Sequence, residues 1–447
     1  MKISVDFSKN IGKIKAVNGV SNGPICHGLD MSKYFKEANV SSVRYHDTDG
    51  GGAYGRYMID VSRIFPNFDA DEYDEKNYHF VHTDYLIKAA LDCGVEIVYR
   101  LGESIDHTIC KVYARPPKDF DKWCRICLQI IKHYNAGWAN GFYYDLKYWE
   151  IWNEPEGRSA NGQQPMWNGG TFDQMLALYK KIAIMIKEYN AELKVGGLSF
   201  MYCNYGTDDW LAFCQKEGLP VDFISFHHYA SDLNWIVEQG QEVQAMKEKY
   251  GFENAEVMIT EWSNLYLENY NGIYWDFIGD PINNTEKRRR LFENQRNEIG
   301  ASFVTGFLIR MNDLPIDKGN YYDFDPNSGF CGLFDRYLEP TKTYYAFKNY
   351  GQMLKYSDCR AFAETEKGYI IASNGKEKAE VLFSNFRGES DIAEFNCKGL
   401  SNFKKVTAYV IDENSTDEKV YEGEIVGDTI SFELPYKKHA TIHVLCE

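Results

Sequence analysis

The segment YWEIWNEPEG, residues 148–157, carries the first evidence for the fold. Its first half, YWEIW, is aromatic and apolar, which is typical of a buried strand. Pro155 then removes a backbone donor, and the residue before a proline is kept out of helical geometry. We therefore expect Glu154 at the tip of a strand, where a local bulge would turn both Asn153 and Glu154 into the same cleft.

Strand-like segments recur from about residue 20 to about residue 345, and longer segments of helical period separate them. Residues 171–190 predict one such helix, and Thr171 with Gln174 predicts a capping box at its start. Eight strands are predicted over residues 23–28, 41–47, 95–103, 146–155, 194–200, 222–230, 256–264 and 302–313. Eight strands that alternate with helices predict a parallel (β/α)8 TIM barrel.

The pattern changes after about residue 350. Segments such as GDTISFELP and HATIHVLC alternate with a period of two, and polar, turn-like stretches separate them. This pattern predicts a C-terminal antiparallel β-sandwich, to which the strand-like first 18 residues could add a strand. We therefore expect a catalytic barrel over residues 19–350 and an accessory β-sandwich domain formed by residues 1–18 and 351–447.

Composition limits the partners of the chain. A formal net charge of −16 over 447 residues argues against binding to nucleic acid or to an anionic membrane surface. The sequence has no apolar run of the roughly 20 residues that span a bilayer, and its start does not resemble a signal peptide. Eleven scattered cysteines, an odd number, favour a reducing compartment. We expect a cytoplasmic protein without a metal or other cofactor, and homo-oligomer formation is left open.

Two glutamates stand at predicted strand ends. Polar residues at the carboxyl ends of barrel strands carry the chemistry of TIM-barrel enzymes. Glu154 ends strand four and Glu261 ends strand seven, so the two acids should face each other across the barrel mouth. Glycoside hydrolysis uses such a pair, one acid to protonate the leaving oxygen and the other to attack the anomeric carbon. Glu150, deeper in strand four, is expected to pair with an inward arginine instead.

Several motifs together resemble clan A of the glycoside hydrolases, and within it family 39, which includes β-xylosidases and α-iduronidases. The motifs are VRYHD, KYWEIWNEPEG, KVGG, SFHHY, ITEWSN and GLFDRYLEPTKTYYAFKNY, and the resemblance covers the barrel. It implies that Glu154 is the general acid/base and Glu261 the nucleophile of a retaining hydrolase. The family pattern also includes a β-sandwich after the barrel.

The resemblance assigns further residues to the substrate site. They are Arg44, His46, Asn153, His227, His228 and Tyr229. By motif position the arginine would lie beside the nucleophile, and the tyrosine would orient it. His46 and Asn153 would bind sugar hydroxyls, the asparagine at the 2-hydroxyl. His228 is the residue between the two motif positions and is a further candidate for substrate contact.

One segment departs from the family pattern. Family xylosidases tend to end strand eight with a tryptophan and then a pair of acids, whereas this chain reads FLIRMNDLPID. Arg310 and Asp313 stand near that place, so Arg310 is a candidate substrate contact and the reacting subsite is expected to differ from one for plain xylose. Tyr274 and Trp275, in the long segment after strand seven, are candidates for lining the cleft.

The leading hypothesis is a retaining glycosidase that cleaves terminal bonds of short oligosaccharides by double displacement. An endo-acting enzyme of the same clan is an alternative, and the residues leave the sugar, anomer and linkage open. A metal-dependent barrel hydrolase could use histidines at strand ends, and activity that survives EDTA would exclude it. A carbohydrate-binding barrel without activity would be excluded by turnover of any aryl glycoside.

Overall fold

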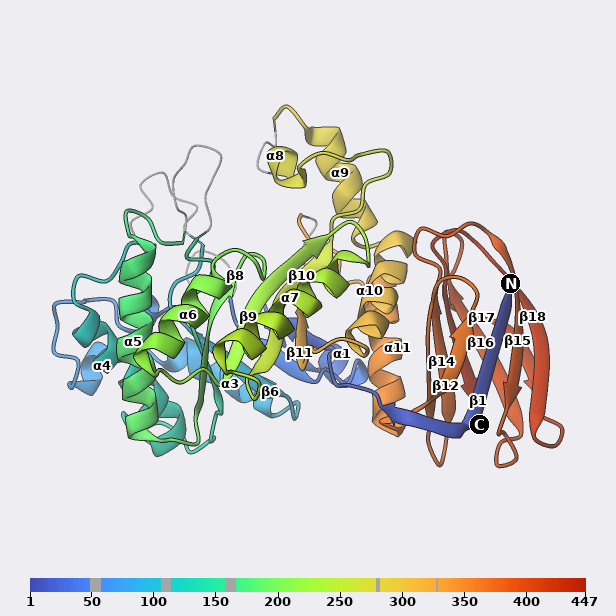
Figure 1. Cartoon of the computed structure of the whole chain (residues 1–447), viewed down its shortest axis with the longest axis horizontal. Coiled ribbons are helices and arrows are strands. Elements are labelled where there is room, and N and C mark those ends of the chain that lie inside the picture. Colours follow the sequence, from blue (N-terminus) through green and yellow to red (C-terminus); the bar gives the residue numbers. More distant parts are fainter. Residues whose placement is uncertain (49–57, 106–113, 157–165, 279–281, 327–328) are drawn as a thin grey trace.

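The computed structural model describes residues 1–48, 58–105, 114–156, 166–278, 282–326 and 329–447. Figure 1 shows a barrel surrounded by helices and, beside it, a curled sheet that contains both chain termini. None of the described helices is both long and apolar enough to cross a membrane.

Eight parallel strands close into the predicted TIM barrel, which confirms the fold class. They are β2 (Gly19–Ser21), β5 (Ser42–Arg44), β6 (Glu96–Leu101), β7 (Tyr148–Ile151), β8 (Lys194–Phe200), β9 (Phe223–Ala230), β10 (Glu256–Asn264) and β11 (Lys318–Tyr321). Nearly every strand residue is buried, as expected for a parallel sheet that is covered on its outer face and filled with side chains inside.

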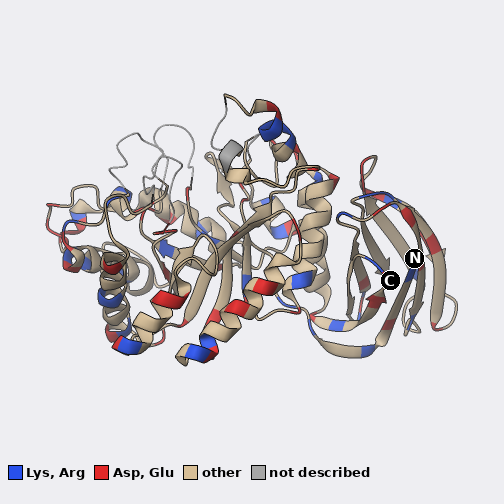
Figure 2. Cartoon of the chain, turned by 45° about the horizontal axis from the view of Figure 1, so that its top comes forward, with Lys and Arg blue, Asp and Glu red and all other residues tan. Residues whose placement is uncertain are grey.

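The helices of this body are α1 (Ser32–Glu37), α2 (Val61–Ile64), α3 (Val81–Leu91), α4 (Phe120–Ala136), α5 (Phe172–Tyr189), α6 (Thr207–Glu217), α7 (Trp235–Tyr250), α8 (Tyr274–Ile278), α9 (Thr285–Asn294), α10 (Glu298–Met311) and α11 (Lys342–Tyr356). Most of them surround the barrel, whereas α8 and α9 project above it (Figure 1). The predicted capping box of Thr171 and Gln174 is present at the start of α5. Acidic and basic residues are intermixed on these helices, whereas the strands of the barrel carry few charges (Figure 2).

The first predicted strand, residues 23–28, is wrong. The strand of the barrel is β2, four residues earlier, and it pairs with β5 through Val20 and Val43. Pro24 has no N–H with which to pair in a central strand, so the chain leaves the barrel before it. Only Ile25–Cys26 (β3) is extended within the predicted segment, and it pairs with Leu29–Asp30 (β4) in a separate two-stranded sheet.

The last predicted strand, residues 302–313, is also wrong, because this segment belongs to helix α10. The side chain of Asn297 caps the helix by accepting a hydrogen bond from the backbone N–H of Ile299. A continuous apolar run does not distinguish a buried strand from a buried helix, and the 14-residue length of α10 is the feature that is typical of a helix. The barrel closes instead through β11, which pairs with β10 and β2.

The second body is a nine-stranded sheet that curls on itself. Its strands are β1 (Lys2–Lys13), β12 (Cys359–Thr365), β13 (Tyr369–Asn374), β14 (Ala379–Ser384), β15 (Asp391–Lys398), β16 (Lys405–Ile411), β17 (Thr416–Glu424), β18 (Thr429–Tyr436) and β19 (Thr441–Cys446). β17 and β18 are the two edges of this sheet. Their side chains nevertheless meet, because the ring of Tyr421 stacks on that of Phe432 at 4.4 Å. The sheet thus encloses a core of its own.

Strand β1 lies inside this sheet between β12 and β15, antiparallel to the first and parallel to the second. Helix α10 packs between the two bodies, and the Ser384 hydroxyl donates to the carbonyl oxygen of Ser302 at 2.6 Å. The division into domains at residues 18 and 350 stays a prediction.

Candidate active site

Strand β7 ends at Ile151, three residues before Glu154. Trp152 and Glu154 adopt left-handed backbone conformations, with φ of 66° and 42°. The predicted bulge is therefore replaced by a strand end with two left-handed residues, which turns both Asn153 and Glu154 into the barrel mouth. Left-handed backbone at residues other than glycine costs free energy and often marks functional sites. The buried indole of Trp152, which donates to the Met166 carbonyl at 2.7 Å, anchors this turn.

Arg44, at the end of β5, is fully buried and joins four strands. Its Nε donates to Glu150 Oε2 at 2.7 Å, and its Nη1 donates to Glu261 Oε1 at 2.6 Å. Its Nη2 donates to Asn153 Oδ1 at 2.6 Å and to Ser199 Oγ at 2.9 Å. The predicted pairing of Glu150 with an inward arginine is thus present. Arginine is suited to this place because its guanidinium stays charged and offers five donors in fixed directions.

The carboxylate of Glu261 accepts a hydrogen bond on each oxygen. In addition to the Arg44 contact on Oε1, the Tyr229 hydroxyl donates to Oε2 at 2.6 Å. Its side chain is 7% exposed, so it borders the open mouth. Donors on both oxygens hold the carboxylate in one orientation.

Glu154 has a different environment. Its side chain is 16% exposed, and Oε1 lies 2.6 Å from Nδ1 of His227. Burial raises the pKa of Glu154 to about 7, although the charge of Arg44 opposes this shift. Burial lowers the pKa of His227 to about 4, so this imidazole is neutral at pH 7. A carboxyl with a raised pKa, beside a second carboxyl that two donors hold in place, is the arrangement of an acid and a nucleophile.

The two carboxyl groups lie close together. One oxygen of Glu154, one oxygen of Glu261 and a ring nitrogen of His227 all lie within 4.8 Å of one another. These three atoms are also where a divalent cation would bind among the described residues. The guanidinium of Arg44 already touches Glu261, so a cation there would meet a positive charge at contact distance.

His46 and Asp47 border the same mouth at the end of β5. Nε2 of His46 lies 3.4 Å from Oδ1 of Asp47. Burial and the charge of Glu261 raise the pKa of Asp47 to about 7. Tyr322, which follows strand β11, donates its hydroxyl to Asp47 Oδ2 at 3.5 Å.

Two predicted substrate contacts lie elsewhere. His228 points to the outer face of β9, where its ring packs between Trp235 and Phe307. This correction follows from the alternation of side chains along a strand, which sends His227 and His228 to opposite faces. Arg310 is on helix α10, where it covers the ring of Tyr369, so it does not stand at the end of strand eight.

The predicted departure from the family pattern at the end of strand eight concerned residues 302–313, which do not form a barrel strand. Asp313, the other residue named there, pairs with Arg360 at 2.6 Å. Tyr322 and Asp323 follow the true eighth strand and occupy the position at the barrel mouth.

Of the two aromatic candidates after strand seven, Trp275 lies at the mouth. It is 36% exposed, contacts the ring of Tyr229 edge-on at 5.4 Å, and donates Nε1 to the Tyr202 hydroxyl at 3.1 Å. Tyr274 instead packs against the small core around Leu291.

Sequence reasoning did not single out Ser199 and Thr260. Both side chains are buried and both contact the charged cluster, Ser199 through Arg44 and Thr260 through Ser199. The available signal was a hydroxyl residue within an otherwise apolar strand, in KVGGLSF and in EVMITEW.

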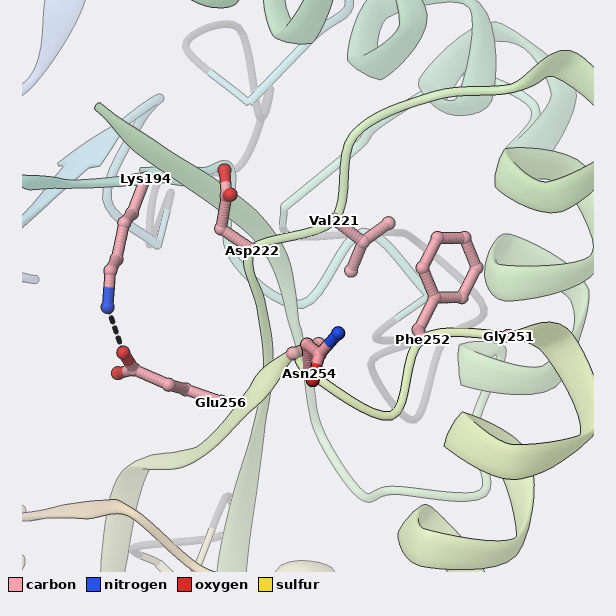
Figure 3. A pocket seen from close by; sticks show the side chains of 8 residues that line it. Lys194, Val221, Asp222, Gly251, Phe252, Asn254 and Glu256 are labelled. Carbon is pink, nitrogen blue, oxygen red and sulfur yellow. Dashed lines mark hydrogen bonds and ion pairs between the residues drawn. The ribbon is translucent and has the colours of Figure 1, made fainter. Parts of the chain in front are cut away.

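A separate pocket lies at the opposite end of the barrel (Figure 3). Lys194 and Glu256, the first residues of β8 and β10, form an ion pair on its wall, and Asp222 lies beside them. It faces away from the two strand-end glutamates.

The sequence and structure resemble those of known proteins. The model of glycosyl hydrolases family 39 matches residues 15–282. A β-xylosidase of Caldicellulosiruptor saccharolyticus is 24% identical over 465 residues, which cover 94% of this chain and 86% of that protein. A glucosidase from Croceicoccus marinus has the same fold, with a TM-score of 0.81, 20% identity and coverage of 100% of this chain and 98% of that one. A β-xylosidase from Caulobacter crescentus aligns with a TM-score of 0.72 and 14% identity, over 100% of this chain and 99% of that one.

Proposed function

Because this chain belongs to glycosyl hydrolase family 39, we propose that it is a retaining glycosidase that removes terminal sugars from short oligosaccharides, as a β-xylosidase does. The observation that carries the mechanism is the spacing of its two strand-end acids, whose nearest oxygens lie within 4.8 Å. Retaining enzymes hold their carboxyl groups about 5 to 5.5 Å apart, whereas inverting enzymes leave about 6.5 to 9.5 Å for a water molecule.

Glu261 is the proposed nucleophile. Arg44 and Tyr229 donate to its carboxylate and orient it, so that it attacks the anomeric carbon and forms a glycosyl-enzyme ester. Glu154 is the proposed acid, which gives its proton to the leaving oxygen in the same step. It then removes a proton from the water that attacks the ester, and the enzyme is restored.

Asn153, His46 and Arg44 are proposed to bind or position the reacting sugar. Asn153 accepts a hydrogen bond from Arg44 through Oδ1, which leaves its amide NH2 to donate to a sugar oxygen. This places the amide beside the nucleophile, where a contact with the 2-hydroxyl would strengthen in the transition state. We leave His228 and Arg310 out of the proposed site.

We also propose that the enzyme works in the cytoplasm. The ten cysteines within the described residues are free thiols, and most of them are buried. Unpaired cysteines in this number fit a reducing compartment.

The stereochemistry of the first product tests the proposed mechanism. A panel of nitrophenyl glycosides would identify the sugar and the anomer that the enzyme accepts. Proton NMR during the first minutes of hydrolysis is then expected to show a product with the same anomeric configuration as the substrate, before mutarotation mixes the two anomers. A first product of opposite configuration would exclude the double displacement, and an absence of turnover on the whole panel would count against a glycosidase.

Activity should fall as pH rises above neutrality. Glu154 acts as an acid only when protonated, and its pKa of about 7 keeps it protonated below that pH. We expect kcat/KM to decrease about tenfold for each pH unit above 7. Substrates with a 2,4-dinitrophenyl leaving group, which needs little protonation, should show a weaker decrease.

Asp47 titrates near the same pH, so Asp47→Asn is the variant that separates the two groups. The basic limb of the profile should persist in Asp47→Asn. If that limb disappeared in the variant, the assignment of the limb to Glu154 would be wrong.

A further inference from the structure

Four buried or nearly buried side chains form a line of hydrogen bonds that ends on the proposed acid. Thr260 Oγ1 lies 2.9 Å from Ser199 Oγ, and Ser199 Oγ lies 2.7 Å from Nε2 of His227. Nδ1 of His227 in turn lies 2.6 Å from Oε1 of Glu154. Ser199, His227 and Thr260 are on β8, β9 and β10, and Glu154 follows the end of β7, so only the closed barrel brings the four together. The chemical effect of this line depends on the direction in which its protons point.

The direction is set at Ser199. Its Oγ must accept a hydrogen bond from Arg44 Nη2, because a guanidinium has donors and no acceptor. The hydroxyl of Thr260 has Ser199 as its one hydrogen-bond partner among the described residues, and a buried hydroxyl that does not donate is costly. Thr260 therefore donates, and Ser199 accepts twice. Its own proton is left for Nε2 of His227.

This direction determines the tautomer of His227. A neutral imidazole carries one proton, so a ring that accepts at Nε2 must donate at Nδ1. The surroundings of Nδ1 agree with this assignment. Nδ1 lies 3.6 Å from Oε2 of Glu261 as well as 2.6 Å from Glu154. A lone pair at Nδ1 would face a carboxylate oxygen, whereas an N–H there is attracted to both acids.

We propose that Thr260 and Ser199 are positioning residues that hold His227 as the Nδ1–H tautomer, so that Oε2 of Glu154 is the oxygen that carries the transferable proton. The inference rests on the proposed role of Glu154 as the acid/base. Oε1 accepts from His227 both when Glu154 is protonated and when it is ionised. The proton on His227 therefore stays in place through both steps. The catalytic proton leaves Oε2 for the leaving oxygen and returns to it from the attacking water.

The opposite direction has an opposite consequence. If His227 carried its proton on Nε2, Nδ1 would accept from the Glu154 carboxyl and stabilise its protonated form. A donor to a carboxylate lowers the pKa of the acid, and an acceptor from the carboxyl raises it. Loss of the line should therefore shift the pKa of Glu154 upward under our proposal and downward under the alternative.

Thr260→Val and Ser199→Ala test the direction in which the pKa of Glu154 shifts. Both remove a hydroxyl with little change in volume, and Thr305→Val is the matched control, because Thr305 is a buried threonine on α10 outside the site. We expect the basic limb of kcat/KM to move upward by about one pH unit in Ser199→Ala, less in Thr260→Val, and not at all in Thr305→Val. Hydrolysis of substrates with poor leaving groups should slow more than that of 2,4-dinitrophenyl glycosides. A downward shift, or an unchanged limb in Ser199→Ala, would overturn the proposal.

A second measurement determines the tautomer of His227 and does not depend on enzyme activity. Long-range 1H–15N correlation spectra of the wild-type protein, labelled with 15N-histidine, distinguish a protonated Nδ1 from a protonated Nε2, and His227→Asn identifies the signals. We expect His227 with its proton on Nδ1, and a proton on Nε2 would overturn the proposal. If the tautomer is as expected but Glu154→Ala keeps full activity, the role of Glu154 has failed and not the direction of the line.

Discussion

Glu261→Ala is expected to lower kcat by about 10⁵- to 10⁶-fold, which is the scale of loss when a nucleophile is removed from a preorganised site. The carboxylate has no substitute among the groups that contact it. Arg44 and Tyr229 are donors to it, and Glu154 lies on the other side of the reacting carbon in the proposed mechanism. No glycosyl-enzyme ester can then form, so the loss should be the same for good and poor leaving groups.

Glu256→Ala is the matched control for this experiment. Glu256 is on the same strand, β10, but at its amino end, where it pairs with Lys194 on the far side of the barrel. This variant should keep near wild-type turnover. Turnover of Glu261→Ala within tenfold of the wild type, in a protein with unchanged circular dichroism, would remove Glu261 from the mechanism.

Glu154→Ala is expected to lower kcat/KM by about 10²- to 10⁴-fold on substrates with poor leaving groups, which is the usual contribution of a general acid. On 2,4-dinitrophenyl glycosides the first step should proceed without the acid, and the glycosyl-enzyme should accumulate because no base activates water. Azide should then restore turnover, since this anion attacks the intermediate without a base and fits the space left by the side chain.

The anomeric configuration of the azide product distinguishes the role of Glu154 from that of Glu261. Glu154→Ala should yield a glycosyl azide with the configuration of the substrate, because two displacements have occurred. Azide that rescues Glu261→Ala would attack from the opposite face and give the inverted product. An inverted azide from Glu154→Ala would mean that the two roles have been exchanged.

The barrel could be predicted from the sequence because its strands repeat one pattern, a short apolar run followed by a polar residue. The prediction was right for the six strands from β5 to β10, where the runs are short and a helix of clear period follows most of them. It was wrong at the first and last strands. Helix α10 is enclosed between the barrel and the nine-stranded sheet, so apolar residues lie on all of its faces. Residues 302–313 therefore do not show the helical alternation of apolar and polar positions.

Chain order and residue type were enough to identify the acids at the ends of strands four and seven, because parallel strands in a barrel all end at one face. The different environments of these two acids were decided only by the tertiary structure. Glu154 and Glu261 are chemically the same residue. Burial raises the pKa of Glu154, which lies beside a neutral imidazole. Glu261 instead accepts hydrogen bonds from a guanidinium and a phenol hydroxyl. These partners come from β5 and β9, at sequence distances over which local propensity carries no information.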